Sequence, residues 1–324
     1  MELKGIHHVS ALTANAKANY SFYTGVLGMR LVKKTVNQDD TSVYHLFYAD
    51  VVGNPGTDLT FFEIPRAGRT YPGVSSISTT SLRVKNDEAL QYWKQRLTEH
   101  QVEHEDIVTE NNRNIISLRD PEGQRLKLVS DETNKGVEAG TPWKKGPVPV
   151  EYAIVGLGPS QLTVNDPAPT VKVLTEVLSF KEVDRYPSQI QGQPDVIVFS
   201  TGEGGTGAEV HLETRTDLPR ERPGRGSVHH VAFRVDNEDE LKYWKDRLQG
   251  ARLPNSGLVE RYYFKSLYFR EPNGILFELA TDGPGFTTDE DPEHLGESLA
   301  LPPYFEQDRE QIEAKLEPLD TKRD

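Results

Sequence analysis

The chain has 324 residues, no cysteine and a formal net charge of −13. Without cysteine it has neither disulfides nor thiolate metal ligands, and its negative charge argues against binding nucleic acid phosphates. No apolar run approaches the roughly 18 residues of a membrane helix, and the N-terminal MELKGIHHVS has no leader-like pattern, so we expect a cytoplasmic protein without membrane contact.

The first 66 residues predict one small βαβββ unit. Apolar periodicity indicates a strand at 5–12, a helix at about 16–27, and strands near 29–36, 42–49 and 58–64. The same order returns as a strand at 76–84, a helix at 86–99, and strands near 103–109, 113–119 and 124–130. A unit of this size covers only one sheet face with its helix, so it must pair with a sister unit.

An internal duplication extends this pattern to the second half. SLRVKNDEALQYWKQRL at 81–97 recurs as AFRVDNEDELKYWKDRL at 232–248, and RDPEGQRLKLVSD at 119–131 recurs as REPNGILFELATD at 270–282. We therefore predict an α+β fold of four βαβββ units in two tandem domains. The predicted parts are domain 1–135, linker 136–150, domain 151–283 and tail 284–324, with a short helix near 306–316 and His294 on the surface.

Comparing the four copies separates scaffold residues from candidate ligands. At the first-strand position the copies read His8, Thr79, Gly158 and His230. At the last-strand position we align Glu63, Lys127, Glu213 and Glu278. A lone strand histidine is ordinarily a structural residue, but two histidines and a glutamate at matching repeat positions favour a metal site, provided that the first and fourth units meet.

The candidate ligand set is His8, His230 and Glu278. Glu278 lies in an apolar run, where a carboxylate is costly without a positive partner such as a metal ion. Two imidazoles and one carboxylate suit an open Fe(II) site, and Mn, Ni or Zn are also acceptable. By strand alternation, we expect His7 and His229 to point to the opposite face in a structural or supporting role.

Three segments resemble the vicinal oxygen chelate superfamily of glyoxalase I, bleomycin resistance proteins and extradiol ring-cleaving dioxygenases: HVAFRVDN, FYTGVLGMRLV and the EPNG turn. The resemblance covers about residues 4–283 and implies mixed sheets curled around a metal site. LYFREPNGILFE at 267–278 is similar to the extradiol signature, which implies a tyrosine, Tyr268, beside the metal. One departure is that residues 259–261 read Val, Glu and Arg near the position of a family histidine.

The ligand set and the resemblance, which is closest to the hydroquinone-type branch, together predict an Fe(II)-dependent, extradiol-type ring-cleaving dioxygenase. Its partners would be O2 and a small catechol- or hydroquinone-like aromatic. Tyr268 would hydrogen-bond a substrate oxygen, and His45 in SVYHLFYAD is a candidate acid or base. An ordinary buried tyrosine and an ordinary sheet histidine are the alternatives for these two residues.

Two other functions stay open. Glu63 aligns with a fourth ligand of glyoxalase I, and four ligands would suit a lyase or isomerase that uses Ni or Zn. The third option is a non-catalytic resistance protein that binds an aromatic compound. The sequence leaves the oligomeric state open, with a homo-oligomer among the options.

Overall fold

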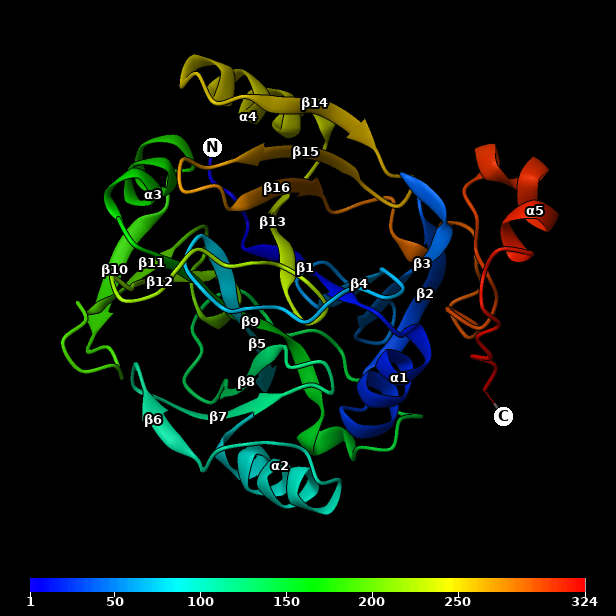
Figure 1. The fold of residues 1–324 in the computed structure, drawn as a ribbon, viewed down its shortest axis with the longest axis horizontal. Helices are drawn as coiled ribbons and strands as arrows, with labels where there is room; N and C mark the ends of the chain where they lie inside the picture. Colours follow the sequence, from blue (N-terminus) through cyan, green and yellow to red (C-terminus); the bar gives the residue numbers. More distant parts are fainter. Residues whose placement is uncertain (324) are drawn as a thin grey trace.

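The computed structural model describes residues 1–323, which form two eight-stranded mixed sheets with helices on their outer faces (Figure 1). The first sheet has the order β14-β15-β16-β13-β1-β4-β3-β2 and the second has the order β10-β11-β12-β9-β5-β8-β7-β6. This arrangement confirms the predicted α+β fold of four βαβββ units.

The strands follow the predicted order in every unit. In the first sheet they are β1 (Ile6–Thr13), β2 (Arg30–Asn37), β3 (Asp40–Ala49), β4 (Asp58–Glu63), β13 (Val228–Val235), β14 (Asn255–Glu260), β15 (Lys265–Arg270) and β16 (Leu276–Thr281). In the second sheet they are β5 (Ser76–Val84), β6 (Val108–Glu110), β7 (Arg113–Arg119), β8 (Arg125–Ser130), β9 (Ile154–Val164), β10 (Lys181–Tyr186), β11 (Val196–Ser200) and β12 (Glu209–Thr214).

Each sheet joins one unit from the first half of the chain to one unit from the second half. In the first sheet, β1 pairs antiparallel with β13, so that His8 faces Ala232 and Ser10 faces His230. In the second sheet, β5 pairs with β9 in the same manner. The first and fourth units therefore share a sheet, which is the condition that the predicted ligand set requires. The proposed boundaries at 1–135 and 151–283 describe sequence repeats, each of which contributes to both sheets.

Two long helices, α2 (Asp87–Glu99) and α4 (Glu238–Gly250), occupy equivalent repeat positions. Each begins after an asparagine whose side chain accepts hydrogen bonds from the first turn, and each has acidic residues in that turn. Trp93 and Trp244 lie at the same place in the two helices and are fully buried against their sheets. The repeated sequence thus encodes a scaffold element in both halves.

The two shorter helices change their hydrogen-bond pattern partway along. α1 (Ala16–Tyr20) continues as a wider π-helical segment over Ser21–Val26, and α3 (Ala168–Lys172) continues in the same way over Val173–Val177. The predicted helix at 16–27 is therefore correct in extent, but its last residues form i to i−5 bonds such as that from Leu27 N–H to Phe22 O. Short 3₁₀ turns occupy Val150–Tyr152 and Thr206–Ala208.

The C-terminal segment after β16 runs along the outer edge of the first sheet (Figure 1, orange to red). It forms 3₁₀ turns at Phe286–Thr288 and Pro303–Asp308 and then α5 (Arg309–Glu313). The α-helix is therefore shorter than the predicted 306–316 at both ends. The amide of Ala300 donates to the carbonyl of Lys34 in β2. His294 is exposed, as predicted. In the described chain, residues 1–323, every helix is too short or too polar to cross a membrane.

Candidate metal centre

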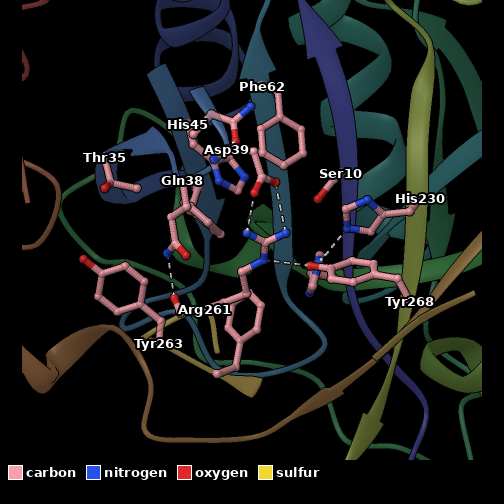
Figure 2. Close-up of a pocket in the computed structure, with 14 residues that line it drawn as sticks. Ser10, Thr35, Gln38, Asp39, His45, Phe62, His230, Arg261, Tyr263 and Tyr268 are labelled. Atoms are coloured by element: carbon pink, nitrogen blue, oxygen red, sulfur yellow. Dashed lines mark hydrogen bonds and ion pairs between the residues drawn. The ribbon is translucent and has the colours of Figure 1, made fainter. Parts of the chain in front are cut away.

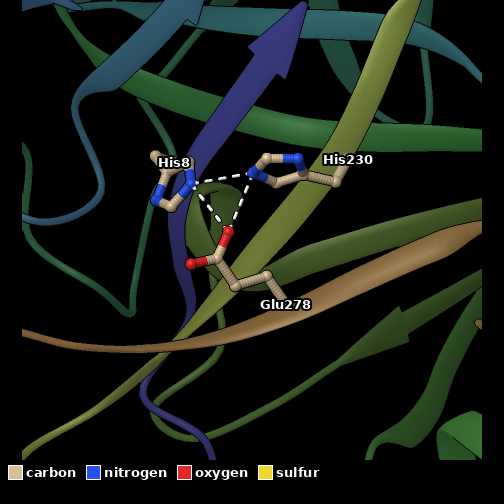
Figure 3. A group of neighbouring side chains, drawn as sticks. All are labelled: His8, His230 and Glu278. Carbon is tan, nitrogen blue, oxygen red and sulfur yellow. Dashed lines mark hydrogen bonds and ion pairs between the residues drawn. The ribbon is translucent and has the colours of Figure 1, made fainter. Parts of the chain in front are cut away.

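The side chains of His8, His230 and Glu278 converge from three neighbouring strands of the first sheet (Figure 3). His8 Nε2 lies 3.1 Å from His230 Nε2 and 3.1 Å from Glu278 Oε2, and His230 Nε2 lies 2.8 Å from the same oxygen. All three side chains are buried. The two imidazoles and the carboxylate that the repeat comparison selected therefore meet at one point.

The spacing of the three ligand atoms matches an octahedral site better than a tetrahedral one. For a metal about 2.1 Å from each ligand atom, ligands at right angles are about 3.0 Å apart, and ligands at the tetrahedral angle are about 3.4 Å apart. The observed separations of 2.8 to 3.1 Å agree with the first value. The set therefore has the geometry of a facial triad, which would leave three neighbouring coordination positions for other ligands.

The surroundings of Glu278 require a cation. Its carboxylate is 0% exposed, and neither oxygen has a hydrogen-bond partner among the described residues apart from its contacts with the two imidazoles. Burial alone would raise the pKa of Glu278, but His8 and His230 outweigh it and hold the pKa well below its usual range. An ionised, buried carboxylate facing two imidazole nitrogens fits a divalent metal.

His7 and His229 contact the two candidate ligand imidazoles through their Nδ1 atoms. His7 Nε2 lies 3.0 Å from the carbonyl oxygen of Thr281, which can only accept, so His7 carries its proton on Nε2. Burial lowers the pKa of His7 to about 3, and the ring is therefore neutral. Its Nδ1 then accepts from His8 Nδ1–H at 2.9 Å, which leaves the lone pair of His8 Nε2 free for a metal.

The same contact recurs in the fourth unit, where the Nδ1 atoms of His229 and His230 are 2.7 Å apart. The expectation that His7 and His229 point away from the ligands is wrong, although their supporting role agrees with these contacts. The pairing of β1 with β13 shifts register at both residues, as in a β-bulge, and such a shift turns adjacent side chains toward one side of a strand.

We expect His7→Phe to weaken metal binding about 10- to 100-fold, because the ring of His8 loses the acceptor that orients it. Metal titration of the purified apoprotein measures this change. His104→Phe is the control, since His104 contacts Thr98 on the second sheet's helix rather than a ligand. Equal affinities of the His7 variant and the wild type would contradict the orienting role.

A pocket with an empty volume of about 460 Å³, including open solvent at its mouth, lies over the ligand set (Figure 2). Aromatic side chains form its apolar walls: Phe47, Phe62, Tyr263 and Phe264. Polar groups complete the lining: Ser10, Thr35, Asn37, Gln38, Asp39, His45, Arg261 and Tyr268. Flat apolar walls with a few polar groups suit a small aromatic molecule.

Tyr268 lies where the resemblance expected it. On β15 it stands directly opposite Glu278 of β16, and its ring packs edge to face against His230 with centroids 5.8 Å apart. Burial and the carboxylate of Glu278 raise the pKa of Tyr268, so its hydroxyl stays protonated and can donate a hydrogen bond into the pocket.

Arg261 is a pocket residue that the sequence marked only as a departure from the family signature. Its Nε lies 3.3 Å from the hydroxyl of Tyr268, and its guanidinium also lies 5.5 Å from the centre of the Tyr268 ring (Figure 2). The two terminal nitrogens pair with the carboxylate of Asp39, and the backbone carbonyl accepts from Gln38. Arg261 therefore places a positive charge in the pocket and joins two loops at its mouth.

His45 also lines the pocket. Its ring lies between Phe47 and Phe62, and its Nε2 is 3.0 Å from the hydroxyl of Thr60, which is in turn 2.7 Å from that of Ser10. Burial, and then the nearby His8 and His230, lower the pKa of His45 well below its usual value. The imidazole is thus neutral, and one of its ring nitrogens carries a free lone pair.

The structure corrects the alignment of Glu63 with Glu278. In the fourth unit, Glu278 pairs with Ala232, which lies two residues after His230. In the first unit, the residue two positions after His8 is Ser10, and its partner is Thr60. The carboxylate of Glu63 instead accepts from the amide of Ala16 at the start of α1. Glu63 is therefore a helix-capping residue and does not supply a fourth ligand.

The second sheet has a cation in place of the metal ligand. Lys127 pairs with Ser81, just as Glu278 pairs with Ala232 in the first sheet. The ammonium of Lys127 contacts Glu110 at 2.5 Å. At Gly158, an added Cβ would lie 2.8 Å from the side chain of Val129, so no imidazole fits there. Among residues 1–323, the first sheet holds the one group of three His, Asp or Glu side chains that can share an ion.

Residues 5–128 and 156–279 match the model of the Glyoxalase/Bleomycin resistance protein/Dioxygenase superfamily. The chain therefore belongs to this superfamily, as the sequence motifs indicated. MhqA of Bacillus subtilis strain 168, provisionally named a ring-cleaving dioxygenase, is 55% identical over 319 residues, which cover 98% of this chain and 100% of MhqA.

Two further relatives extend this comparison. The chlorohydroquinone/hydroquinone 1,2-dioxygenase of Sphingobium indicum is 29% identical over 313 residues, covering 94% of this chain and 93% of the relative. The crystal structure of a provisionally assigned dioxygenase from Bacillus subtilis subsp. subtilis strain 168 superposes with a TM-score of 0.89 at 34% identity and covers 99% of both chains. The similarity to these relatives therefore extends over nearly the whole chain.

Proposed function

We propose that the protein is an Fe(II)-dependent, extradiol-type dioxygenase that cleaves the ring of a hydroquinone- or catechol-like aromatic with O2. The observation that carries this proposal is the facial set of His8, His230 and Glu278 at the base of an aromatic-walled pocket. Such a set leaves neighbouring positions for a substrate oxygen and O2. The names of the relatives MhqA and chlorohydroquinone/hydroquinone 1,2-dioxygenase point to the same reaction class.

When bound, the metal would supply a Lewis acid that favours the phenolate form of the substrate and a redox centre for O2. The protein would supply substrate binding and orientation. Phe62 and Phe264 flank the space where an aromatic ring fits, and Tyr268 can donate to a substrate oxygen. Arg261 accompanies that tyrosine and stabilises negative charge on the same oxygen.

His45 is the proposed proton acceptor. Its neutral imidazole lines the pocket opposite the fourth-unit residues, and the hydroxyls of Thr60 and Ser10 connect its Nε2 toward the strand of His8. Tyr268 stays protonated in this site, so the two residues have complementary roles as donor and acceptor. The protein is also proposed to be cytoplasmic, in agreement with its cysteine-free sequence.

Oxygen consumption tests the proposal. We expect the anaerobically purified apoprotein, loaded with Fe(II), to consume one O2 per hydroquinone or catechol and to form a ring-opened product visible by mass spectrometry. Loading with Zn should give no oxygen uptake, because Zn has no redox chemistry. Turnover of a glutathione hemithioacetal by the Ni-loaded protein, or tight binding of hydroquinone without oxygen uptake, would contradict the proposal.

A further inference from the structure

The turn between β14 and β15 carries three pocket-lining residues, Arg261, Tyr263 and Phe264. The turn is compact: Arg261 N–H donates to Phe264 O at 3.0 Å, and Tyr263 N–H donates to Arg261 O at 2.9 Å. Tyr262 adopts a left-handed conformation with φ of 70°, which is strained for a residue with a side chain. Since β14 is an edge strand, contacts from outside the hairpin must hold the turn in place.

The C-terminal segment provides those contacts. Gly285 N–H donates to the carbonyl of Tyr263 at 2.8 Å, and the hydroxyl of Tyr263 donates to Asp289 Oδ2 at 2.8 Å. The ring of Tyr263 packs against Phe286, with centroids 5.3 Å apart. Both the backbone and the side chain of this pocket residue are therefore fastened to residues after β16.

A buried lysine in turn anchors the C-terminal segment to β2. Lys33 Nζ is 0% exposed, lies 2.6 Å from Asp289 Oδ1 and 3.1 Å from the carbonyl of Phe286, and also pairs with Glu290. The same ammonium lies 4.6 Å from the centre of the Tyr263 ring. Removing these carboxylates would leave a buried charge without a partner, so the segment is held firmly against the sheet.

We infer that the segment Gly285–Glu290 positions the pocket wall formed by Tyr263 and Phe264, and that this wall selects aromatic substrates by the size of their ring substituents. This inference rests on the proposed function for its substrate class. Phe264 lies 5.2 Å from the rings of both His7 and His8, so the wall borders the ligand set directly. Asp289 is thus a positioning residue that acts through Tyr263.

Asp289→Asn and Tyr263→Phe each remove one part of the link while keeping the shape of the side chain. We expect either variant to raise KM for hydroquinone about three- to tenfold with kcat within about twofold of the wild type, since the lost contacts lie outside the reacting atoms. Tyr263→Phe loses one buried hydrogen bond, and Asp289→Asn also loses the negative charge that faces Lys33. The KM of the double variant for hydroquinone should be no higher than that of the more affected single variant, because both changes break the same contact. Glu293→Gln is the control. Glu293 lies in the C-terminal segment after Glu290, and the substitution removes its exposed ion pair with Lys145.

Hydrogen exchange of the metal-free protein tests the positioning step independently of turnover. In Asp289→Asn, peptides that contain residues 261–264 should exchange at least about fivefold faster than in the wild type or in Glu293→Gln. Unchanged exchange would overturn the positioning role even if the enzyme is active. Faster exchange in a protein that never consumes oxygen would instead overturn the proposed function and leave the link intact.

Tyr263→Ala tests the selectivity step. Its smaller side chain should raise the ratio of kcat/KM for tert-butylhydroquinone to that for hydroquinone by about tenfold or more, because a bulky substituent gains the vacated space. Metal content, measured on the same sample, should stay at the wild-type level. An unchanged ratio would overturn the assignment of this wall as the determinant of substituent size.

Discussion

Glu278→Gln is expected to abolish stoichiometric metal binding and to reduce oxygen uptake at least about a thousandfold, equivalent to roughly 4 kcal/mol of transition-state stabilisation. The amide keeps the volume of the carboxylate but removes the only anionic ligand of the set. Elemental analysis after purification and oxygen uptake with added Fe(II) measure the two effects. His294→Gln changes an exposed histidine and should leave both unchanged.

The same substitution should lower the stability of the metal-free protein. In the wild type, His8 and His230 stabilise the buried carboxylate and lower its pKa, and glutamine loses that attraction. The apo variant should therefore unfold at a lower temperature than the apo wild type, whereas metal should raise the unfolding temperature of the wild type alone. A variant that retains one metal per chain would contradict the ligand assignment.

Tyr268→Phe is expected to lower kcat about a hundredfold while metal content stays at the wild-type level, because the variant loses the hydroxyl donor but keeps the ring that packs on His230. Steady-state oxygen uptake and elemental analysis separate these effects. Tyr262→Phe is the matched control, since Tyr262 lies in the neighbouring turn outside the pocket lining. An equal loss of kcat in Tyr268→Phe and Tyr262→Phe would indicate a disturbed hairpin rather than a lost hydrogen-bond donor.

The sequence was sufficient to predict which three side chains converge because the chain repeats itself. Histidines at 8 and 230 stood out against Thr79 and Gly158 at the equivalent positions of the other units. Glu278 stood out as a carboxylate within an apolar strand. Both signals are local, and they became a site only when the sheet joined the first unit to the fourth. The position of Tyr268 followed from a motif of fixed spacing on two paired strands.

The rest of the pocket was not predictable from the same signals. Arg261, Tyr263 and Gln38 come from turns, whose side chains follow no strand periodicity. The contact of Gln38 with Arg261 spans 223 positions of the chain, and that of Tyr263 with Asp289 spans 26. Glu63 was misaligned by three residues because the match relied on residue type, whereas strand register assigns Thr60 to that place. Sequence periodicity thus identifies strand residues on one face better than it identifies the loops that close over them.

The pairing of β1 with β13 has a consequence for biosynthesis. His230 and Glu278 are translated more than 200 residues after His8. The central strands of the first sheet can therefore come together only after most of the chain has been made, which is a slow, high-contact-order event. A truncated nascent polypeptide that ends before β13 contains one of the three candidate ligands, so all three could hold a metal only after β16 has been translated.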